Sequence, residues 1–448
     1  MSIVVGPGDV MLKDFEVPEG GKPLLLEADA PGLRIFSPKR QVVVVPVVGD
    51  SEPVTFELRA NEPGRRRISI SAWDDGSCLG QLIIEVAVRA DARVREDQTA
   101  RGDMRFGRID GEVTLVVRRD EARRYRFEFR DVDNPAEVKG MLKYDPGSAV
   151  ERLLARLDGL ARGGRYPTGL ARDYLVNAGL ELWEELIPEG LRRQFWERQG
   201  RIQHLTILSE ADTVPWELLY PQDIGHEAGF LVEQFPVTRA VFDRLPPRSL
   251  RLRPACFVLP HGSPPEADIE VAALHMLLDP DRPHADTVAT LPPLLELIHK
   301  GDFGVLHFAC HSRFDPEDGS TIHLDCPFLP MQLTKAGSDR TLAAHTPLIF
   351  INACRSALGV ASYNRLDSWA EKFLRAGAGA FIGSLWAVSD GAAREFAMEL
   401  YRRLQSGQAL GAAVMSARTA AASLPGDPTW LAYAAYGNSL AKVDTLPG

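Results

Sequence analysis

The C-terminal half of this 448-residue chain alternates short apolar runs with amphipathic segments at regular intervals. The apolar runs are rich in β-branched and aromatic residues, which is typical of strands in the centre of a parallel sheet. The segments between them carry apolar residues at helical spacing. Strands are expected at 255–259, 288–290, 304–310, 347–352 and 380–385, and helices at 267–278, 291–300, 368–376, 391–404 and 410–422. The alternation predicts an α/β domain with a mostly parallel sheet flanked by helices.

Two of these strands end close to side chains that can carry chemistry. The run 304–310 is followed by His311, and the run 347–352 is followed two residues later by Cys354. Ligands of open α/β sheets bind in the crevice beyond the carboxyl ends of adjacent strands. If the two strands are neighbours, His311 and Cys354 meet in that crevice, and a thiol beside an imidazole is a nucleophile with its base. The pattern therefore predicts a cysteine peptidase.

The residues before 251 divide into two further regions. Residues 1–92 predict a small all-β, sandwich-like domain, because turn signals separate four short runs at 42–48, 53–60, 67–73 and 81–88. A charged and weakly patterned stretch, 93–108, is the best linker candidate. Residues 109–250 combine a β-hairpin pattern with helical spacing, which predicts an α+β subdomain packed on the catalytic domain, 251–448.

The composition argues against several other classes of protein. A formal charge of −10 disfavours a nucleic-acid-binding protein, because phosphate contacts need a basic surface. No apolar run approaches the roughly 20 residues that span a bilayer, and no secretory signal is recognisable. The five cysteines are too widely spaced for a disulfide framework, and no phosphate-binding loop follows a strand. We therefore expect a cytoplasmic protein that binds neither nucleic acid nor membrane and uses no cofactor.

Beyond the two strand ends, an ordered series of motifs resembles the CHAT family of caspase-like peptidases, relatives of separases, metacaspases and caspases. The resemblance covers roughly residues 170–440. Its motifs are, in chain order, VPWELL at 214–219, an acidic helix at 266–278, LHFACH at 306–311, NACRS at 352–356, AGAGAFIGSLWAVSD at 376–390, and the segments 413–422 and 430–433. The resemblance implies a caspase-like fold and cysteine endopeptidase activity.

The resemblance also implies a role for the residues at the two strand ends. Cys354 is the nucleophile and His311 the base, and the backbone amides of Ser312 and Cys354 are the donors to the oxyanion. The family usually has glycine after the histidine, so Ser312 is a departure from its pattern. Trp216 and Glu217, far along the chain from the dyad, are interpreted as scaffold.

Three further residues, Asn352, Trp386 and Asp390, are expected to bind the substrate. In the separase-like relatives an acid in the segment of Asp390 looks toward the S1 pocket, which would favour Arg or Lys at P1. The alternative for Asp390 is the N-cap of the helix that follows. Asn352 stands where metacaspases carry an acid that selects basic P1 residues, and its neutral amide removes that charge. A basic P1 preference therefore depends on Asp390 alone.

Other interpretations of the same side chains carry less weight. A cysteine at a strand end is by itself more often a buried structural thiol. His307 is expected in the core and Cys310 on the opposite face of the strand. A zinc site formed by His307, Cys310, His311 and Cys326 is disfavoured by that alternation and by the lack of a CxxC pair. No metal is expected.

The biological setting follows from the resemblance alone. It implies a prokaryotic conflict, antiviral immunity or cell-death system, in which a partner or a processing event activates the enzyme. The expected partners are a protein substrate and an activating or sensor protein. The connections 312–346 and 355–367 lie beside the predicted site, and long polar connections there are typical of mobile lids. Two alternatives stay open: a catalytically silent scaffold that binds partners, and an acyltransferase or other thiol hydrolase with the same dyad.

Overall fold

A computed structural model of the chain forms two compact units, Met1–Asp110 with Val132–Asn134 and Phe242–Leu245, and Gly111–Asp131 with Pro135–Val241 and Pro246–Gly448. The structure describes residues 2–5, 9–12, 17–30, 33–60, 63–74, 77–89, 103–106, 112–119, 125–130, 136–140, 153, 157, 168–209, 214–223, 226–227, 229–241, 246–315, 319–355, 363–423 and 426–444.

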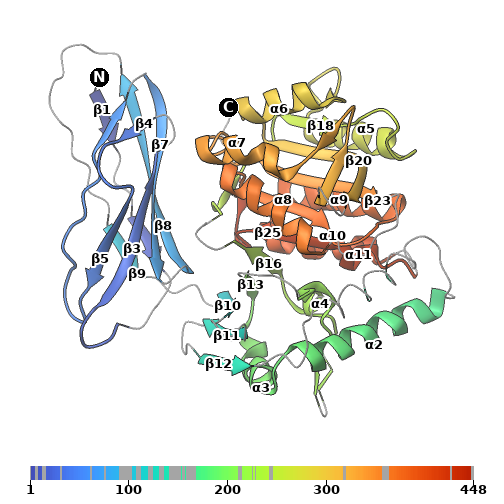
Figure 1. Ribbon diagram of the computed structural model, residues 1–448, viewed down its shortest axis with the longest axis horizontal. Coiled ribbons are helices and arrows are strands. Elements are labelled where there is room, and N and C mark those ends of the chain that lie inside the picture. Colours follow the sequence, from blue (N-terminus) through green and yellow to red (C-terminus); the bar gives the residue numbers. More distant parts are fainter. Residues whose placement is uncertain are drawn as a thin grey trace. The chain divides into compact units, whose positions relative to one another are not determined.

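The first unit is built from β-strands, as the alternating runs before residue 92 predict (Figure 1). Its main sheet is antiparallel and has the order β1(Ser2–Val5), β8(Ser77–Arg89), β7(Gly64–Asp74), β3(Lys22–Asp29), β5(Arg40–Val45). Two separate pairs are β2(Asp9–Leu12) with β9(Asp103–Phe106) and β4(Leu33–Ile35) with β6(Leu58–Ala60). The linker prediction is wrong at β9, because these residues pair in parallel with β2. Of the strand expected at 53–60, only β6 forms.

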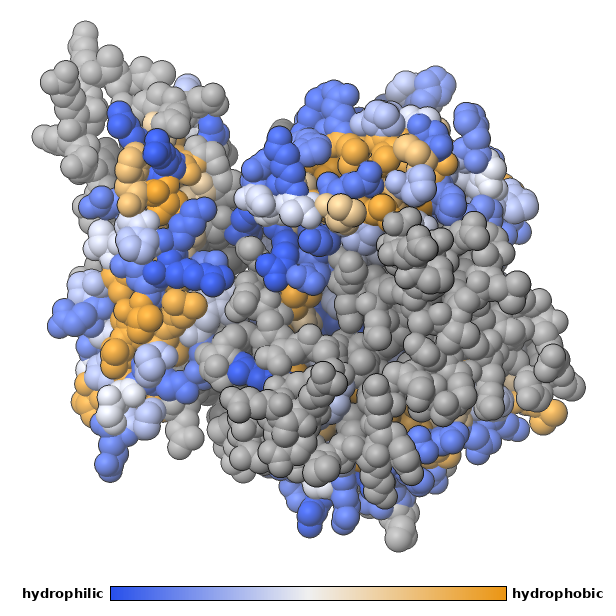
Figure 2. Space-filling view, viewed as in Figure 1, coloured by the Kyte–Doolittle hydropathy of each residue, from blue (hydrophilic) through white to orange (hydrophobic). Residues whose placement is uncertain are grey.

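The strands of this unit bury apolar residues on alternate positions. Ile68, Leu82, Ile84 and Val86 belong to one buried cluster, and a second cluster contains Leu24, Val43, Ala72 and Leu79. Other apolar residues reach the surface, and orange areas lie over the strands of this unit in Figure 2. Val42 and Val44 of β5 are 63% and 53% exposed. Because β5 alternates buried and exposed valines, it covers a core on one face only.

The second unit is organised around a sheet of thirteen strands. Eleven of them follow one another in the order β12(Ala136–Gly140), β11(Tyr125–Arg130), β10(Glu112–Arg119), β13(His204–Ser209), β16(Val237–Ala240), β25(Tyr433–Gly437), β24(Ala380–Ser384), β23(Leu348–Arg355), β20(Val305–Asp315), β18(Ala255–Val258), β19(Asp286–Val288). The other two, β21(Gly319–His323) and β22(Pro327–Phe328), extend from β20. The smaller ladders are β14(Gln222–Asp223) with β15(His226–Glu227) and β17(Ser249–Leu250) with β26(Lys442–Val443).

The direction of the strands changes once in the middle of this sheet. From β19 to β24 all neighbours are parallel, whereas β25 is antiparallel to β24 and parallel to β16. The five strands β19, β18, β20, β23 and β24 therefore end at the same edge. Strands from before and after residue 250 pair in the same 13-stranded sheet. The expected domain boundary at this residue therefore stays a prediction.

Helices lie on both sides of this sheet (Figure 1). They are α2(Thr168–Leu186), α3(Glu189–Arg198), α4(Leu231–Gln234), α5(Ala267–Leu278), α6(Leu291–Lys300), α7(Thr334–Asp339), α8(Tyr363–Ala376), α9(Asp390–Gln405), α10(Leu410–Ala421) and α11(Thr429–Ala432), with 3₁₀ turns η1(Gln199–Arg201), η2(Trp216–Leu218) and η3(Pro330–Leu333). Among the helices of the described residues, none is both long and apolar enough to cross a membrane.

Local signals explain why several helices begin and end where the sequence predicts. The bounds of α5 and α6 are the expected ones. In α6, prolines occupy the first turn, where no backbone donor is needed, and Gly301 ends the helix with φ +65°. The helical spacing predicted in the 109–250 region also extends before α2, where most residues lie outside the described ones. Leu153 and Leu157 are described there, and both are helical.

The segment 312–346 is not the long loop that its polarity suggested. β20 continues to Asp315 and pairs with β21, and β22, η3 and α7 follow. Phe328 of β22 is fully buried and packs on Trp369 of α8, with 4.9 Å between ring centroids. Buried aromatic contacts hold this segment on the sheet, so the lid prediction is wrong for 319–346. Residues 356–362 of the second expected lid lie outside the described residues.

Candidate active site

Strands β20 and β23 lie side by side and run parallel. Their register pairs Val305 with Leu348 at one end and Ser312 with Arg355 at the other, and in it His311 is the partner of Cys354. Neighbouring strands are about 4.8 Å apart, and partners in a parallel ladder lie on the same face of the sheet. The fold therefore brings the two positions predicted for the dyad next to each other, near the carboxyl ends of both strands.

The individual dyad residues are described to different depths. The His311 side chain is half-buried. The backbones of Ser312 and Cys354 belong to β20 and β23, whereas their side chains lie outside the described residues. Ser312 is also the partner of Ile322 in β21, so it continues a ladder rather than entering a loop. The catalytic and oxyanion roles of these residues stay predictions.

A buried polar network lies on the same face of the sheet, below the predicted dyad. His307 Nε2 is 2.9 Å from Glu270 Oε1, and the Asn352 Nδ2 amide donates to the same oxygen at 2.7 Å. His307 is fully buried, and Asn352 and Glu270 are 3% and 7% exposed. The His307 ring also stacks on Phe350, with 4.8 Å between centroids. Through Glu270, a helix residue contacts both strands of the candidate site at once.

Two tyrosines complete this network. The Tyr401 hydroxyl of α9 lies 3.1 Å from His307 Nδ1, and the Tyr433 hydroxyl of β25 donates to Asn352 Oδ1 at 2.7 Å. Burial, and then the charge of Glu270, raise the pKa of Tyr401 well above its ordinary value, so the phenol stays protonated. Its O–H can donate to His307 Nδ1 in the tautomer whose Nε2–H donates to Glu270. In this arrangement one series of hydrogen bonds leads from Tyr401 through His307 to Glu270, and the other leads from Tyr433 through Asn352 to Glu270.

The network places His307 where the sequence predicts, in the core. It gives Asn352 two buried partners, Glu270 and Tyr433, so these contacts are structural, and substrate binding by Asn352 stays a prediction. Sequence reasoning missed Glu270. The signal was present, because Glu270 falls on the face of α5 that also buries Val271 and Leu274. A carboxylate on the buried face of a helix requires partners.

The other two residues expected to bind substrate follow β24, which pairs with β23. Trp386 is 2% exposed, and within the part of the chain that the structure describes its indole Nε1 has no hydrogen-bond partner. Asp390 is half-buried and is the first residue of α9, whose N-cap is Ser389. The N-cap alternative for Asp390 is therefore wrong by one position. Because β24 ends at the same edge as β23, this segment leaves the sheet on the dyad side.

The four side chains of the disfavoured zinc site do not lie together in the described structure. Cys310 is fully buried and lies on the face of β20 opposite His307 and His311. Cys326 is exposed, and its thiol donates to its neighbour Asp325 at 3.7 Å. Among the described residues, no group of three or more histidine, cysteine, aspartate or glutamate side chains is arranged to hold a metal ion.

Comparisons with known proteins agree with the motif series. The family model of the CHAT domain matches residues 177–438, more than half of the chain, including both strands of the candidate site. This match confirms the predicted resemblance to caspase-like CHAT peptidases. A search of curated proteins found no match.

Two solved structures illustrate what the fold is similar to. Separase from Saccharomyces cerevisiae, solved with securin, has 11% identity and a TM-score of 0.45 over 75% of this chain and 30% of that one. RgpB from Porphyromonas gingivalis, solved as a complex of its pro- and mature domains, has 13% identity and a TM-score of 0.40 over 67% of this chain and 79% of that one. This chain therefore spans less than a third of the separase chain it matches.

Proposed function

Because this chain belongs to the CHAT domain family, we propose that it is a cysteine endopeptidase that cuts a protein substrate with a dyad of Cys354 and His311. The observation that carries the proposal is the register of two parallel strands, in which these two residues are partners. A Cys–His pair at the carboxyl edge of a parallel sheet supplies a nucleophile and its base in the place where such sheets bind ligands.

The proposed reaction begins with transfer of the Cys354 proton to His311. A free thiol has a pKa of about 8.5, so an imidazole neighbour is needed to raise the thiolate fraction at neutral pH. The thiolate sulfur attacks the scissile carbonyl carbon, and the backbone amides of Ser312 and Cys354 donate to the resulting oxyanion. Collapse breaks the C–N bond, and the imidazolium gives its proton to the leaving amine. Water then hydrolyses the thioester, with His311 as the base, and restores the free thiol.

The substrate side of the proposal rests on the segment after β24. Asp390 would offer a carboxylate to an Arg or Lys side chain at P1, while the buried amide of Asn352 adds no charge. A charge-assisted hydrogen bond contributes about 1.5–3 kcal/mol, which is roughly ten- to hundredfold in discrimination. Asp390→Asn should therefore flatten the P1 profile measured with a peptide library. An unchanged preference would contradict this part of the proposal.

The proposed setting is a cytoplasmic enzyme in a prokaryotic conflict, antiviral defence or cell-death system, activated by a partner protein or a processing event. The family resemblance supports this setting. A reducing compartment would keep the Cys354 thiol free. Incubating the full chain with lysates from cells that do or do not express the proteins encoded next to its own gene would test for an activator, because cleavage should appear only with the activating protein.

The dyad is tested by comparing the wild type with Cys354→Ala and His311→Ala on a peptide library and on lysate proteins. Loss of a nucleophile or its base should lower cleavage by at least about a thousandfold. Cys326→Ala is the matched control, since it removes an exposed thiol elsewhere and should leave cleavage unchanged. Equal cleavage by the wild type and Cys354→Ala would refute the proposal. Absence of any cleavage, with or without activator, would favour the silent scaffold.

A further inference from the structure

The buried network under the candidate site connects five separate elements through one carboxylate. Glu270 comes from α5, His307 from β20, Asn352 from β23, Tyr401 from α9 and Tyr433 from β25. Each hydrogen bond joins residues at least 37 positions apart in the sequence. Such bonds do not stabilise a helix or strand locally, so they determine how these elements sit against one another.

Burying the Glu270 carboxylate costs desolvation free energy, which indicates that the network does more than fill the core. A carboxylate with 7% exposure needs strong donors, and it receives two on the same oxygen, from His307 and Asn352. The Glu270 charge also contributes, after burial, to raising the pKa of Cys310 well above its ordinary value. An apolar residue could fill this space without requiring two buried polar partners.

The position of the network relative to the dyad suggests that purpose. Asn352 is two residues before Cys354, and His307 is four residues before His311, all on one face of the sheet. At about 3.3 Å per residue, Asn352 lies about 7 Å before Cys354 along β23, and His307 lies about 13 Å before His311 along β20. Glu270 is thus hydrogen-bonded to both strands, four residues before His311 on β20 and two residues before Cys354 on β23.

We propose that Glu270 is a positioning residue: by accepting hydrogen bonds from His307 and Asn352, it holds the ends of β20 and β23 so that His311 can activate Cys354. This inference rests on the proposed function. In this role Glu270 acts through the two strands and needs no contact of its own with the substrate or the sulfur. Tyr433 and Tyr401 support it by orienting Asn352 and His307.

Positioning and a simple charge effect predict opposite changes in the acidity of the Cys354 thiol when the Glu270 charge is removed. A nearby negative charge disfavours a thiolate, so removing the Glu270 charge would by itself make the Cys354 thiol more acidic. Losing the His311 contact would instead make the thiol less acidic, toward the ordinary pKa of about 8.5. Positioning therefore predicts that the Glu270→Gln change raises the pH midpoint of Cys354 reactivity, against the direction of the charge.

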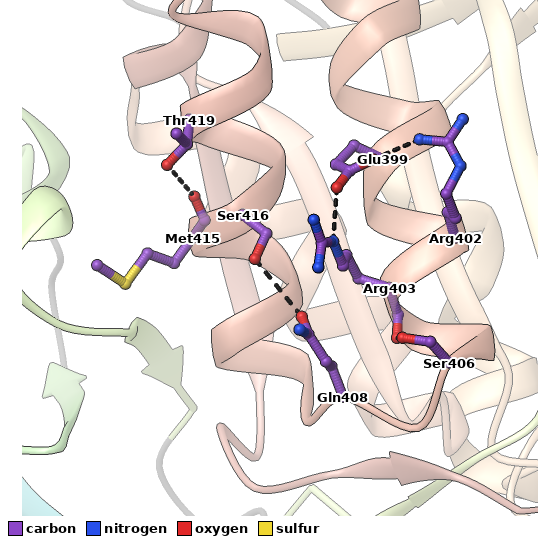
Figure 3. A network of polar contacts seen from close by, with 8 residues as sticks. All are labelled: Glu399, Arg402, Arg403, Ser406, Gln408, Met415, Ser416 and Thr419. Carbon is purple, nitrogen blue, oxygen red and sulfur yellow. Dashed lines mark hydrogen bonds and ion pairs between the residues drawn. The ribbon is translucent and has the colours of Figure 1, made fainter.

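The experiment measures iodoacetamide alkylation of the native full chain from pH 5 to 10, with the Cys354 peptide quantified separately by mass spectrometry. Glu270→Gln keeps the side-chain shape and removes the charge. Tyr433→Phe is a milder second variant that removes only the donor to Asn352. Glu399→Gln is the matched control, since Glu399 is 8% exposed and also accepts from two side chains, Arg402 and Arg403, but these lie on its own helix α9 (Figure 3).

The wild type should show a Cys354 midpoint at least about one pH unit below 8.5. Glu270→Gln should raise it by about one unit and Tyr433→Phe by less, while Glu399→Gln should leave it unchanged. An unchanged or lower midpoint in Glu270→Gln, or an equal rise in Glu399→Gln, overturns the inference and leaves the proposed function intact. A wild-type midpoint at 8.5 overturns both. Thermal melts of each variant confirm that the alkylated protein is folded.

Discussion

Replacing Glu217 by glutamine should lower the free energy of unfolding of the second unit by about 3–5 kcal/mol, because it breaks a fully buried ion pair. Glu217 and Arg239 are each 1% exposed. Arg239 Nε donates to Glu217 Oε1 at 2.9 Å, and Arg239 Nη2 donates to the other carboxylate oxygen. The pair joins η2, in the VPWELL motif, to β16 of the large sheet.

The expected magnitude follows from what glutamine leaves behind. Its amide keeps one acceptor but turns an N–H donor toward the guanidinium, so a charge-assisted bond worth about 1.5–3 kcal/mol is lost. Arg239 then loses the carboxylate charge that it pairs with, and the same charge also acts on Arg418, which is 3% exposed. Burial is the main cause that lowers the pKa of Arg418 to about 10, and Glu217 opposes this while Arg239 adds to it. Removing the carboxylate therefore affects two buried cations.

Urea unfolding followed by near-UV circular dichroism measures the change, with the midpoint compared at constant slope. The double variant Glu217→Met with Arg239→Met should cost less than Glu217→Gln alone, since no unpaired charge remains at either position. Glu399→Gln should cost at most about 1 kcal/mol, because its arginine partners are half-exposed. A loss below about 1 kcal/mol for Glu217→Gln, or a double variant less stable than the single one, would refute the reasoning.

Three further predictions concern single side chains. Cys256 and Cys310 should resist alkylation in the native protein at pH 8, because burial raises the pKa of Cys256 to about 12 and that of Cys310 further; labelling of either before unfolding would contradict this. Burial lowers the pKa of His204 and His345, so the folded state resists protonation and stability should fall as the pH drops below about 6.5; His204→Gln should flatten the change in Tm between pH 7.5 and 5.5, and an identical slope would count against it. Gly377 has φ +104°, and a Cβ there would lie 2.4 Å from a neighbouring backbone nitrogen; Gly377→Ala should therefore lower stability by at least about 1–3 kcal/mol in urea unfolding, and a neutral result would be inconsistent with this geometry.

Local features of the sequence predict many of the elements of the second unit and place His311 and Cys354 near the ends of two strands. The bounds of α5 and α6 follow from helical spacing, early prolines and a terminal glycine, all of which act within a few residues. The apolar runs before His311 and Cys354 identify β20 and β23 for the same reason. The ordered motifs identify the CHAT family because their residues and order are read directly from the chain.

Which of these elements meet, and in what register, could not be predicted from the sequence. The pairing of His311 with Cys354 and the reversal of direction at β25 depend on contacts between distant segments, which no local period encodes. The same is true of Glu270: its place on the buried face of α5 is visible in the sequence, but its partners come from two strands. A buried carboxylate must find donors wherever packing brings them, so this cluster exists only once the helices have packed on the sheet.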